Sequence, residues 1–325
     1  MQNFYPSYYQ LFHCIAAECP DSCCQGWDIV IDSDTEALYE KVGDYIGGRL
    51  RDAIYTDDDG DRVFRLRDEK KCPFWGDDKL CDIYRELGEE YLCDTCAQFP
   101  RLRMEFADFT EHSLAIACPE AARLILQTDR AYDELVMTQP KGCEDYTAEL
   151  MRFLIAARGQ IAVILSNDLS LRGRLTEALL YAYHIQEQLA PEYTSADTDE
   201  NTLTNLYSTL EYIEERNRVA ITGCHTSADD LSVNEPELTR LSLYYLYRYF
   251  LTAVDTLDVQ TPIKLMVSSV LMIAALSKKE SVSLEEAAQR FSKETEQSYE
   301  NMELICGGLA RIPFGYFEKI LLPSS

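Results

Sequence analysis

Beyond residue 118 the apolar residues recur three and four positions apart, which is the period of an amphipathic α-helix. This pattern predicts helices over 145–166, 172–190, 201–219, 236–257, 262–278 and 283–308. Start signals support several of them, because Pro236 and Pro262 fit first-turn positions and Ser283 forms a capping box with Glu286. A further helix is predicted to begin at Pro119. The C-terminal part is therefore expected to be an all-α bundle.

The first 125 residues lack this helical period. Short apolar stretches alternate there with turn signals such as Cys19-Pro20 and Cys72-Pro73. We expect irregular structure with short helices and one small hairpin over 54–66. The predicted fold class is mainly α: residues 1–125 form an irregular, cysteine-rich metal- or cluster-binding domain, and residues 126–325 form an all-helical domain.

The segment LSLYYLYRYFLTAV at 241–254 places five aromatic residues in one predicted helix. Aromatic rings at helical spacing are typical of a core helix packed between neighbours, and this is the favoured interpretation. The alternative is an aromatic wall that contacts a ligand.

Composition and charge narrow the class of protein. The chain has 325 residues, 46% of them hydrophobic, and a formal net charge of −26. This composition indicates a globular protein, and its acidity argues against a nucleic-acid or anionic-membrane surface while favouring cationic partners. The sequence shows neither a secretory signal nor an apolar run of membrane-spanning length. We therefore expect a cytoplasmic protein that binds neither membrane nor nucleic acid.

Cysteine is the most informative residue type in the chain. Of 12 cysteines, nine precede residue 119: Cys14, Cys19, Cys23, Cys24, Cys72, Cys81, Cys93, Cys96 and Cys118. In a reducing compartment such clustered thiols are typical metal ligands, and four thiolates suit either zinc or an iron–sulfur cluster. Nine donors exceed one tetrahedral site, which leaves two sites, or one site plus structural thiols.

Three segments carry a resemblance to a known family: FHCIAAECPDSCCQGWDIVID, KCPFWGDDKLCDIYRELGEEYLCDTCAQFPR and SLAIACPEAARLIL. They closely resemble the flagellin lysine-N-methylase family, which belongs to a wider group of zinc- or iron-chelating CxxCxxCC proteins. The resemblance implies methyl transfer from S-adenosylmethionine to surface lysines of flagellin or another lysine-rich protein. It also implies an iron–sulfur cluster of the [4Fe–4S] type, held by cysteines among the nine, with zinc as the alternative metal.

Methyl transfer to lysine needs a group that removes a proton. The lysine amine, whose reference pKa is near 10.4, must be neutral before it attacks the methyl sulfonium. Candidates beside the cysteines are Asp82, Tyr84, Asp94 and Arg101, with Arg101 placed to pair with a cofactor carboxylate or a local aspartate.

The route by which S-adenosylmethionine binds is not indicated by any familiar motif. The chain has neither the Cys-x₃-Cys-x₂-Cys triplet of radical enzymes nor a Rossmann glycine loop. Two alternatives to an enzyme stay open. One is a zinc-stabilised protein-interaction module, and the other is a metal- or redox-responsive protein without enzymatic activity.

Overall fold

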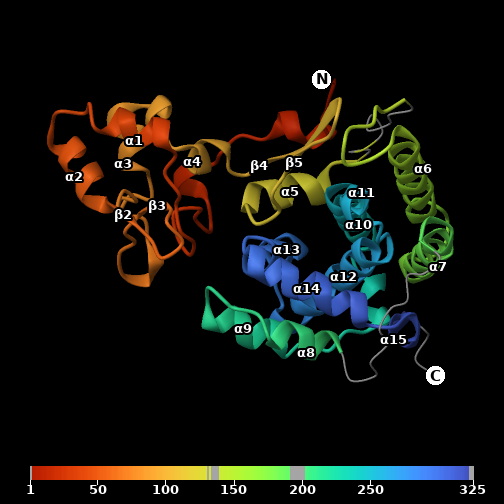
Figure 1. The fold of residues 1–325 in the computed structure, drawn as a ribbon. Coiled ribbons are helices and arrows are strands. Elements are labelled where there is room, and N and C mark those ends of the chain that lie inside the picture. Colours follow the sequence, from red (N-terminus) through yellow and green to blue (C-terminus); the bar gives the residue numbers. More distant parts are fainter. Residues whose placement is uncertain (1, 130–131, 133–138, 191–201, 322–325) are drawn as a thin grey trace. The chain divides into compact units, whose positions relative to one another are not determined.

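The computed structural model describes residues 2–129, 132, 139–190 and 202–321 (Figure 1). The chain forms two compact units. We call the first, His13–Leu102 with Cys118–Glu120, the cysteine unit. We call the second the helical unit; it contains Met1–Phe12, Arg103–Ala117 and Ala121–Ser325. The domain boundary between residues 125 and 126 stays a prediction.

The cysteine unit consists of short elements joined by turns. They are α1 (Ser33–Tyr39), α2 (Tyr45–Ala53), β2 (Ile54–Thr56), β3 (Arg62–Phe64), α3 (Asp82–Leu87) and α4 (Asp94–Gln98) (Figure 1). Strands β2 and β3 pair antiparallel with Tyr55 opposite Val63, which confirms the predicted hairpin. Helices this short are not stable alone and depend on caps and packing. Asp32 and Asp44 supply caps, because their carboxylates accept backbone N–H bonds at the starts of α1 and α2.

The core of the cysteine unit mixes aliphatic, aromatic and thiol side chains. Its fully buried members are Ile29, Ile31, Tyr39, Ile46, Leu50, Phe64, Cys72, Phe74, Ile83 and Cys93. Phe64 packs against Phe74 with ring centroids 5.0 Å apart, and Tyr39 stacks on Phe64 with ring centroids 6.3 Å apart. Apolar contact around the two thiols therefore fixes their position by packing.

A three-stranded sheet of order β1-β5-β4 was not predicted from the sequence. It consists of β1 (Gln2–Phe4), β5 (Phe109–Leu114) and β4 (Arg101–Glu105). Strand β1 runs parallel to β5, with Asn3 opposite Thr110. Partners so distant in sequence leave no local pattern, and β1 is only three residues long.

The rest of the chain is mainly helical over the residues that the structure describes, as predicted. The helices are α5 (Pro119–Gln127), α6 (Ala148–Leu165), α7 (Leu171–Leu189), α8 (Leu203–Ser208), α9 (Glu215–Thr222), α10 (Glu235–Tyr249), α11 (Ala253–Thr256), α12 (Gln260–Glu280), α13 (Leu284–Thr295), α14 (Tyr299–Arg311) and α15 (Phe314–Leu321) (Figure 1). The fold class, mainly α with an irregular N-terminal region, is confirmed. The capping interaction at the start of α13 is present, since the Ser283 hydroxyl accepts a hydrogen bond from the Glu286 N–H.

Three predicted helices are interrupted in the structure. The prediction over 201–219 was wrong in its middle, because α8 ends at Ser208 and α9 starts at Glu215. The prediction over 283–308 breaks after Thr295, where Ser298 caps a new helix by accepting the Asn301 N–H. The helix over 236–257 ends at Tyr249 and continues as a 3₁₀ turn followed by α11. In each case the apolar period runs through the break, so the pattern of apolar residues does not mark where the helix ends.

Helix α12 is the central element of the helical unit. It contacts α7, α10, α13 and α14, and almost every residue from Gln260 to Leu276 is buried. By length and composition alone it could cross a membrane, but 94% of its apolar window is buried inside the protein. Such burial is typical of the core helix of a globular unit.

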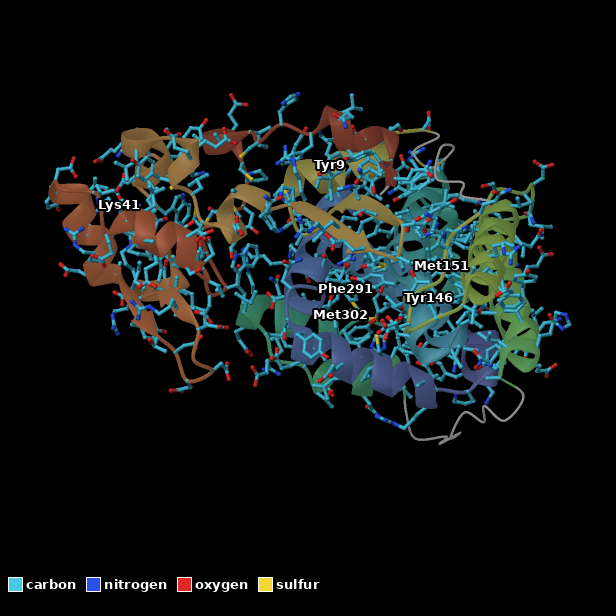
Figure 2. All side chains as sticks on the ribbon, turned by 45° about the horizontal axis from the view of Figure 1, so that its top comes forward. Tyr9, Lys41, Tyr146, Met151, Phe291 and Met302 are labelled. Carbon is cyan, nitrogen blue, oxygen red and sulfur yellow. The ribbon has the colours of Figure 1, made fainter. Side chains whose placement is uncertain are left out.

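Phe291 of α13 fills part of this core (Figure 2). It is 1% exposed and packs edge-on against Tyr207 of α8, with ring centroids 5.4 Å apart. We expect Phe291→Ala to lower the free energy of unfolding by about 3–5 kcal/mol, because it removes apolar contact and leaves a cavity. Urea denaturation measures this loss. The matched control is Tyr299→Ala, a truncation at a 74% exposed ring, which should change stability by less than about 0.5 kcal/mol.

Candidate metal centre

Five of the nine predicted ligands share one part of the cysteine unit. Cys72 and Cys93 are 4% and 1% exposed within the core, and Cys24, Cys81 and Cys96 pack against it. Backbone contacts fix some of these positions, since the Cys72 N–H donates to the Cys24 carbonyl at 2.8 Å. We call these five residues the inner thiols.

The Cys-x₂-Cys pair lies at the start of α4. Cys93 is the residue that precedes the helix, and Cys96 lies in its first turn. A side-chain hydrogen bond joins the two sulfurs. It lowers the pKa of Cys93 and raises that of Cys96, whose burial and neighbours Cys93, Cys72 and Cys24 raise it further. Within the pair, Cys93 is thus the sulfur that loses its proton more readily.

The surroundings of Cys72 and Cys81 favour the protonated thiol. Burial raises the pKa of Cys72 to about 12, and the charges of Cys81 and Cys93 contribute. Burial also raises the pKa of Cys81, with smaller contributions from Asp82 and Cys23. Several thiolates so close together need a nearby positive charge, and soft metal ions supply it.

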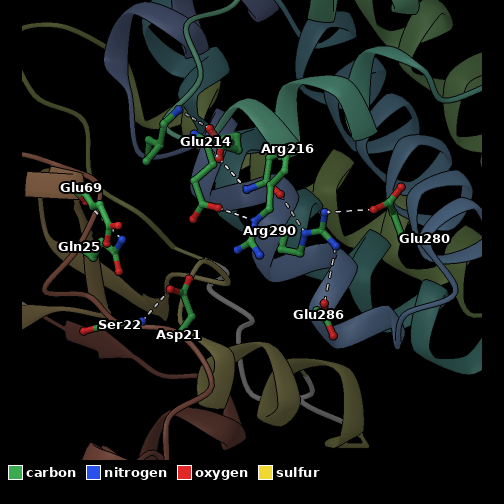
Figure 3. A network of polar contacts seen from close by, with 12 residues as sticks. Asp21, Ser22, Gln25, Glu69, Glu214, Arg216, Glu280, Glu286 and Arg290 are labelled. Atoms are coloured by element: carbon green, nitrogen blue, oxygen red, sulfur yellow. Dashed lines mark hydrogen bonds and ion pairs between the residues drawn. The ribbon is translucent and has the colours of Figure 1, made fainter. Parts of the chain in front are cut away.

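Cys14, Cys19 and Cys23 form a second, more accessible group, which we call the outer thiols. Burial raises the pKa of Cys19, and the charges of Cys23, Asp21 and Cys14 act on it as well. Cys14 and Cys23 are exposed. The loop that carries them is held by short hydrogen bonds, such as that from the Ser22 N–H to Asp21 at 2.7 Å (Figure 3).

Four cysteines are not assigned to either group. Cys118 is buried and immediately precedes α5 in the cysteine unit. Cys143, Cys224 and Cys306 belong to the helical unit, where the Cys224 thiol donates to the Ala220 carbonyl.

The cysteine thiols suit a thiophilic metal, but the described side chains do not surround a common point at which an ion could bind. Within the described ranges, no group of three or more His, Cys, Asp or Glu side chains is arranged to hold a metal ion. What the structure supplies is proximity, softness and one thiol with a lowered pKa. The assignment of the nine cysteines to metal sites stays a prediction.

The candidate acid–base residues lie in separate settings. Asp82 is buried at the start of α3 and forms ion pairs with Arg49 at 2.9 Å and Arg85 at 2.5 Å. Tyr84 is 55% exposed. Asp94 is exposed at the start of α4, and its N–H donates to Asp32.

Arg101 is exposed at the first position of β4. Among the four candidates, Asp82 is paired with Arg49 and Arg85, and these ion pairs give it a structural role. The catalytic roles proposed for these residues from the sequence stay predictions.

The burial of the aromatic residues of α10 supports the interpretation of this segment as a core helix. Tyr244, Tyr245 and Phe250 are fully buried. The tyrosine hydroxyls of this helix converge on a carboxylate that the sequence did not single out, Glu296 in the turn after α13. No sequence pattern links a glutamate to tyrosines about fifty residues away, so only the fold reveals the cluster.

More polar aromatic contacts continue from this cluster through the helical unit. The Tyr8 hydroxyl lies 2.9 Å from that of Tyr132 and 3.1 Å from that of Ser113. Tyr132 stacks on Tyr247 with ring centroids 4.4 Å apart, and the guanidinium of Arg158 lies 4.5 Å from the Tyr247 ring. Burial raises the pKa of Tyr8 to about 12, so this phenol is a neutral donor at physiological pH.

Comparisons with known proteins confirm the resemblance to lysine-N-methylases. The chain is 28% identical over 134 residues to proteins named lysine-N-methylase from Salmonella typhimurium and Salmonella choleraesuis. Over the same length it is 29% identical to the flagellar biosynthetic protein FliU of Salmonella muenchen. The match covers 37% of this chain, 75% of FliU and 31% of each lysine-N-methylase, so it spans less than a third of the methylases' own length.

No family model and no solved structure matches the chain. The similarity to proteins named lysine-N-methylase is therefore confined to part of the chain and to a smaller part of those proteins.

We expect Asp82→Asn to weaken the cysteine unit, because it leaves two arginines beside an uncharged amide. The free energy of unfolding of this unit should fall by about 2–3 kcal/mol, measured by urea denaturation. Asp78→Asn is the matched control: Asp78 pairs with the same Arg85 but is exposed, and its loss should cost less than about 1 kcal/mol. Equal effects of the two variants would contradict the structural role of Asp82.

Proposed function

We propose that this protein is an S-adenosylmethionine-dependent lysine N-methyltransferase that acts on surface lysines of flagellin or a similarly lysine-rich protein. The observation that carries the proposal is the 134-residue similarity to proteins named lysine-N-methylase. The name of FliU supports a flagellar substrate. The formal charge of −26 fits two cationic reactants, an ammonium group and a sulfonium.

We propose that the inner thiols hold an iron–sulfur cluster. Cys24, Cys72, Cys93 and Cys96 are the favoured four ligands, because Cys96 interacts electrostatically with the other three. The inner thiols are enclosed by apolar side chains of the core, which would exclude water from a bound group. When bound, a cluster supplies redox-active iron and positive charge. The outer thiols then form a second set of donors or remain free.

The chain's own groups must also handle a proton. The substrate ammonium has to lose it before attack on the methyl group, and a carboxylate is the simplest acceptor. Asp94 is the best placed of the predicted residues, because it is exposed beside the inner thiols at the start of α4. Asp82, held by two arginines, is less available.

One purification tests the metal and the activity together. Purified without oxygen, the protein should be brown and contain iron and acid-labile sulfide, and it should transfer labelled methyl groups from S-adenosylmethionine to flagellin lysines. Cys96→Ser should lose most of the iron and reduce methyl transfer by at least about tenfold. Cys306→Ser, a control in the helical unit, should retain both.

The alternatives give different results in the same measurements. A colourless protein with stoichiometric zinc and no methyl transfer would contradict the proposal and support a zinc-stabilised interaction module. Reversible oxidation of the Cys93–Cys96 pair without methyl transfer would support a redox-responsive protein.

A further inference from the structure

Three tyrosine hydroxyls of α10 bond to a single carboxylate. Tyr245 donates to Glu296 at 2.8 Å and Tyr249 donates to it at 2.6 Å, while Tyr244 lies at 3.5 Å. Tyr244 and Tyr245 are fully buried, whereas Tyr249 and Glu296 are half-buried. The buried phenols therefore fix the orientation of a carboxylate that the surroundings can still reach.

Arg248 is half-buried near this carboxylate, and one of its guanidinium nitrogens is buried without a hydrogen-bond partner. Its guanidinium lies 5.2 Å from the centre of the Tyr249 ring. Its Nε atom is buried without a hydrogen-bond partner, and Arg248 forms no ion pair with any residue that the structure describes. Arginine is rarely buried unless it is paired, because its five N–H donors lose their water.

Arg158 in the same unit shows the usual arrangement. It is buried, and it donates to both oxygens of Glu111 at 2.7 and 2.5 Å. Removal from water thus explains the pairing of Arg158, whereas the Nε–H of Arg248 has no partner among the described residues. A planar guanidinium with an unpaired donor fits a carboxylate or another planar oxyanion.

The charge of Arg248 is maintained by its neighbours. Burial works to lower the pKa of the guanidinium, but the acidic groups of Tyr249, Tyr244, Glu296 and Tyr8 outweigh it and raise this pKa. Arg248 is therefore a permanent cation, and it lies near a carboxylate without neutralising it by contact.

We propose that Arg248 and Glu296 form a binding site for a zwitterionic α-amino-acid group, in which Arg248 binds the carboxylate and Glu296 binds the ammonium. The two side chains share Tyr249, whose ring lies near Arg248 and whose hydroxyl orients Glu296. The inference rests on the proposed function: the methyl donor S-adenosylmethionine ends in such a group. The tyrosine faces suit its sulfonium through cation–π attraction.

The test uses two ligands that transfer no methyl group. S-adenosylhomocysteine carries the amino-acid group, and methylthioadenosine lacks it. By isothermal titration calorimetry the wild-type protein should bind S-adenosylhomocysteine at least about tenfold more tightly than methylthioadenosine. Arg248→Gln should weaken S-adenosylhomocysteine binding by about 10–100-fold and leave methylthioadenosine binding unchanged. Arg216→Gln, at an exposed arginine of α9, is the matched control and should bind both ligands as the wild type does.

A thermal melt without ligand separates binding from a structural role. Because Arg248 has an unpaired buried nitrogen, Arg248→Gln should leave the melting temperature unchanged or raise it. A fall of several degrees, with equal loss of both ligands, would assign Arg248 to the core and overturn the proposal.

Two further outcomes distinguish this inference from the proposed function. If Arg248→Gln binds S-adenosylhomocysteine like the wild type while methyl transfer persists, the site is wrong and the proposed function stands. If the wild type binds neither ligand and transfers no methyl group, the proposed function fails and this inference fails with it.

Discussion

The cysteine unit depends on keeping several thiols together inside an apolar core. Cys72 and Cys93 occupy positions that aliphatic side chains fill in most small cores, between Phe74, Ile83 and Leu50. As neutral thiols they pack like small hydrophobic groups, but as thiolates they repel one another in a medium that screens charge poorly. Neutral thiols can therefore pack in this core as they stand, and a bound cation would offset the repulsion that deprotonation creates.

The helical unit is organised around a single buried helix, α12. The almost wholly buried α12 gives α7, α10, α13 and α14 a common surface, so their positions follow from packing against one helix. Polar groups inside the unit are then arranged in pairs and networks. Glu294 illustrates this: its carboxylate accepts N–H bonds from Ile213, Glu214 and Asn217 and so closes the loop before α9. The neighbouring Glu296 instead collects the tyrosines of α10.

The sequence was sufficient where structure follows local periodicity. Helices α6 and α7 match the predicted ranges within a few residues, and the β2–β3 hairpin follows from its turn residues. It was insufficient where one turn interrupts a continuing apolar stripe, as at Ser298, because a cap outweighs the periodicity there.

Contacts between distant segments were also beyond the sequence. The pairing of β1 with β5 joins residues more than a hundred positions apart, and the meeting of Cys24 with Cys72 depends on the core between them. The sequence identifies the nine candidate thiols, but their division into inner and outer groups can be seen only in the fold. The cluster of tyrosines around Glu296 could not be predicted either, because its members are far apart in the sequence.

Asp32 connects helix α1 to the helix that carries Cys93 and Cys96. Its carboxylate caps α1 through Thr35, and it also accepts the N–H of Asp94 at the start of α4. Helix α4 is five residues long, too short to persist by itself, and it carries Cys93 at its cap and Cys96 in its first turn. The pKa of Asp32 is lowered by these hydrogen bonds, which outweigh the opposing effect of its burial. Asp32 thus joins the starts of the two helices. We therefore expect local opening of α1 and α4 to be coupled, so that amide exchange in α1 reports on changes at Cys93 and Cys96.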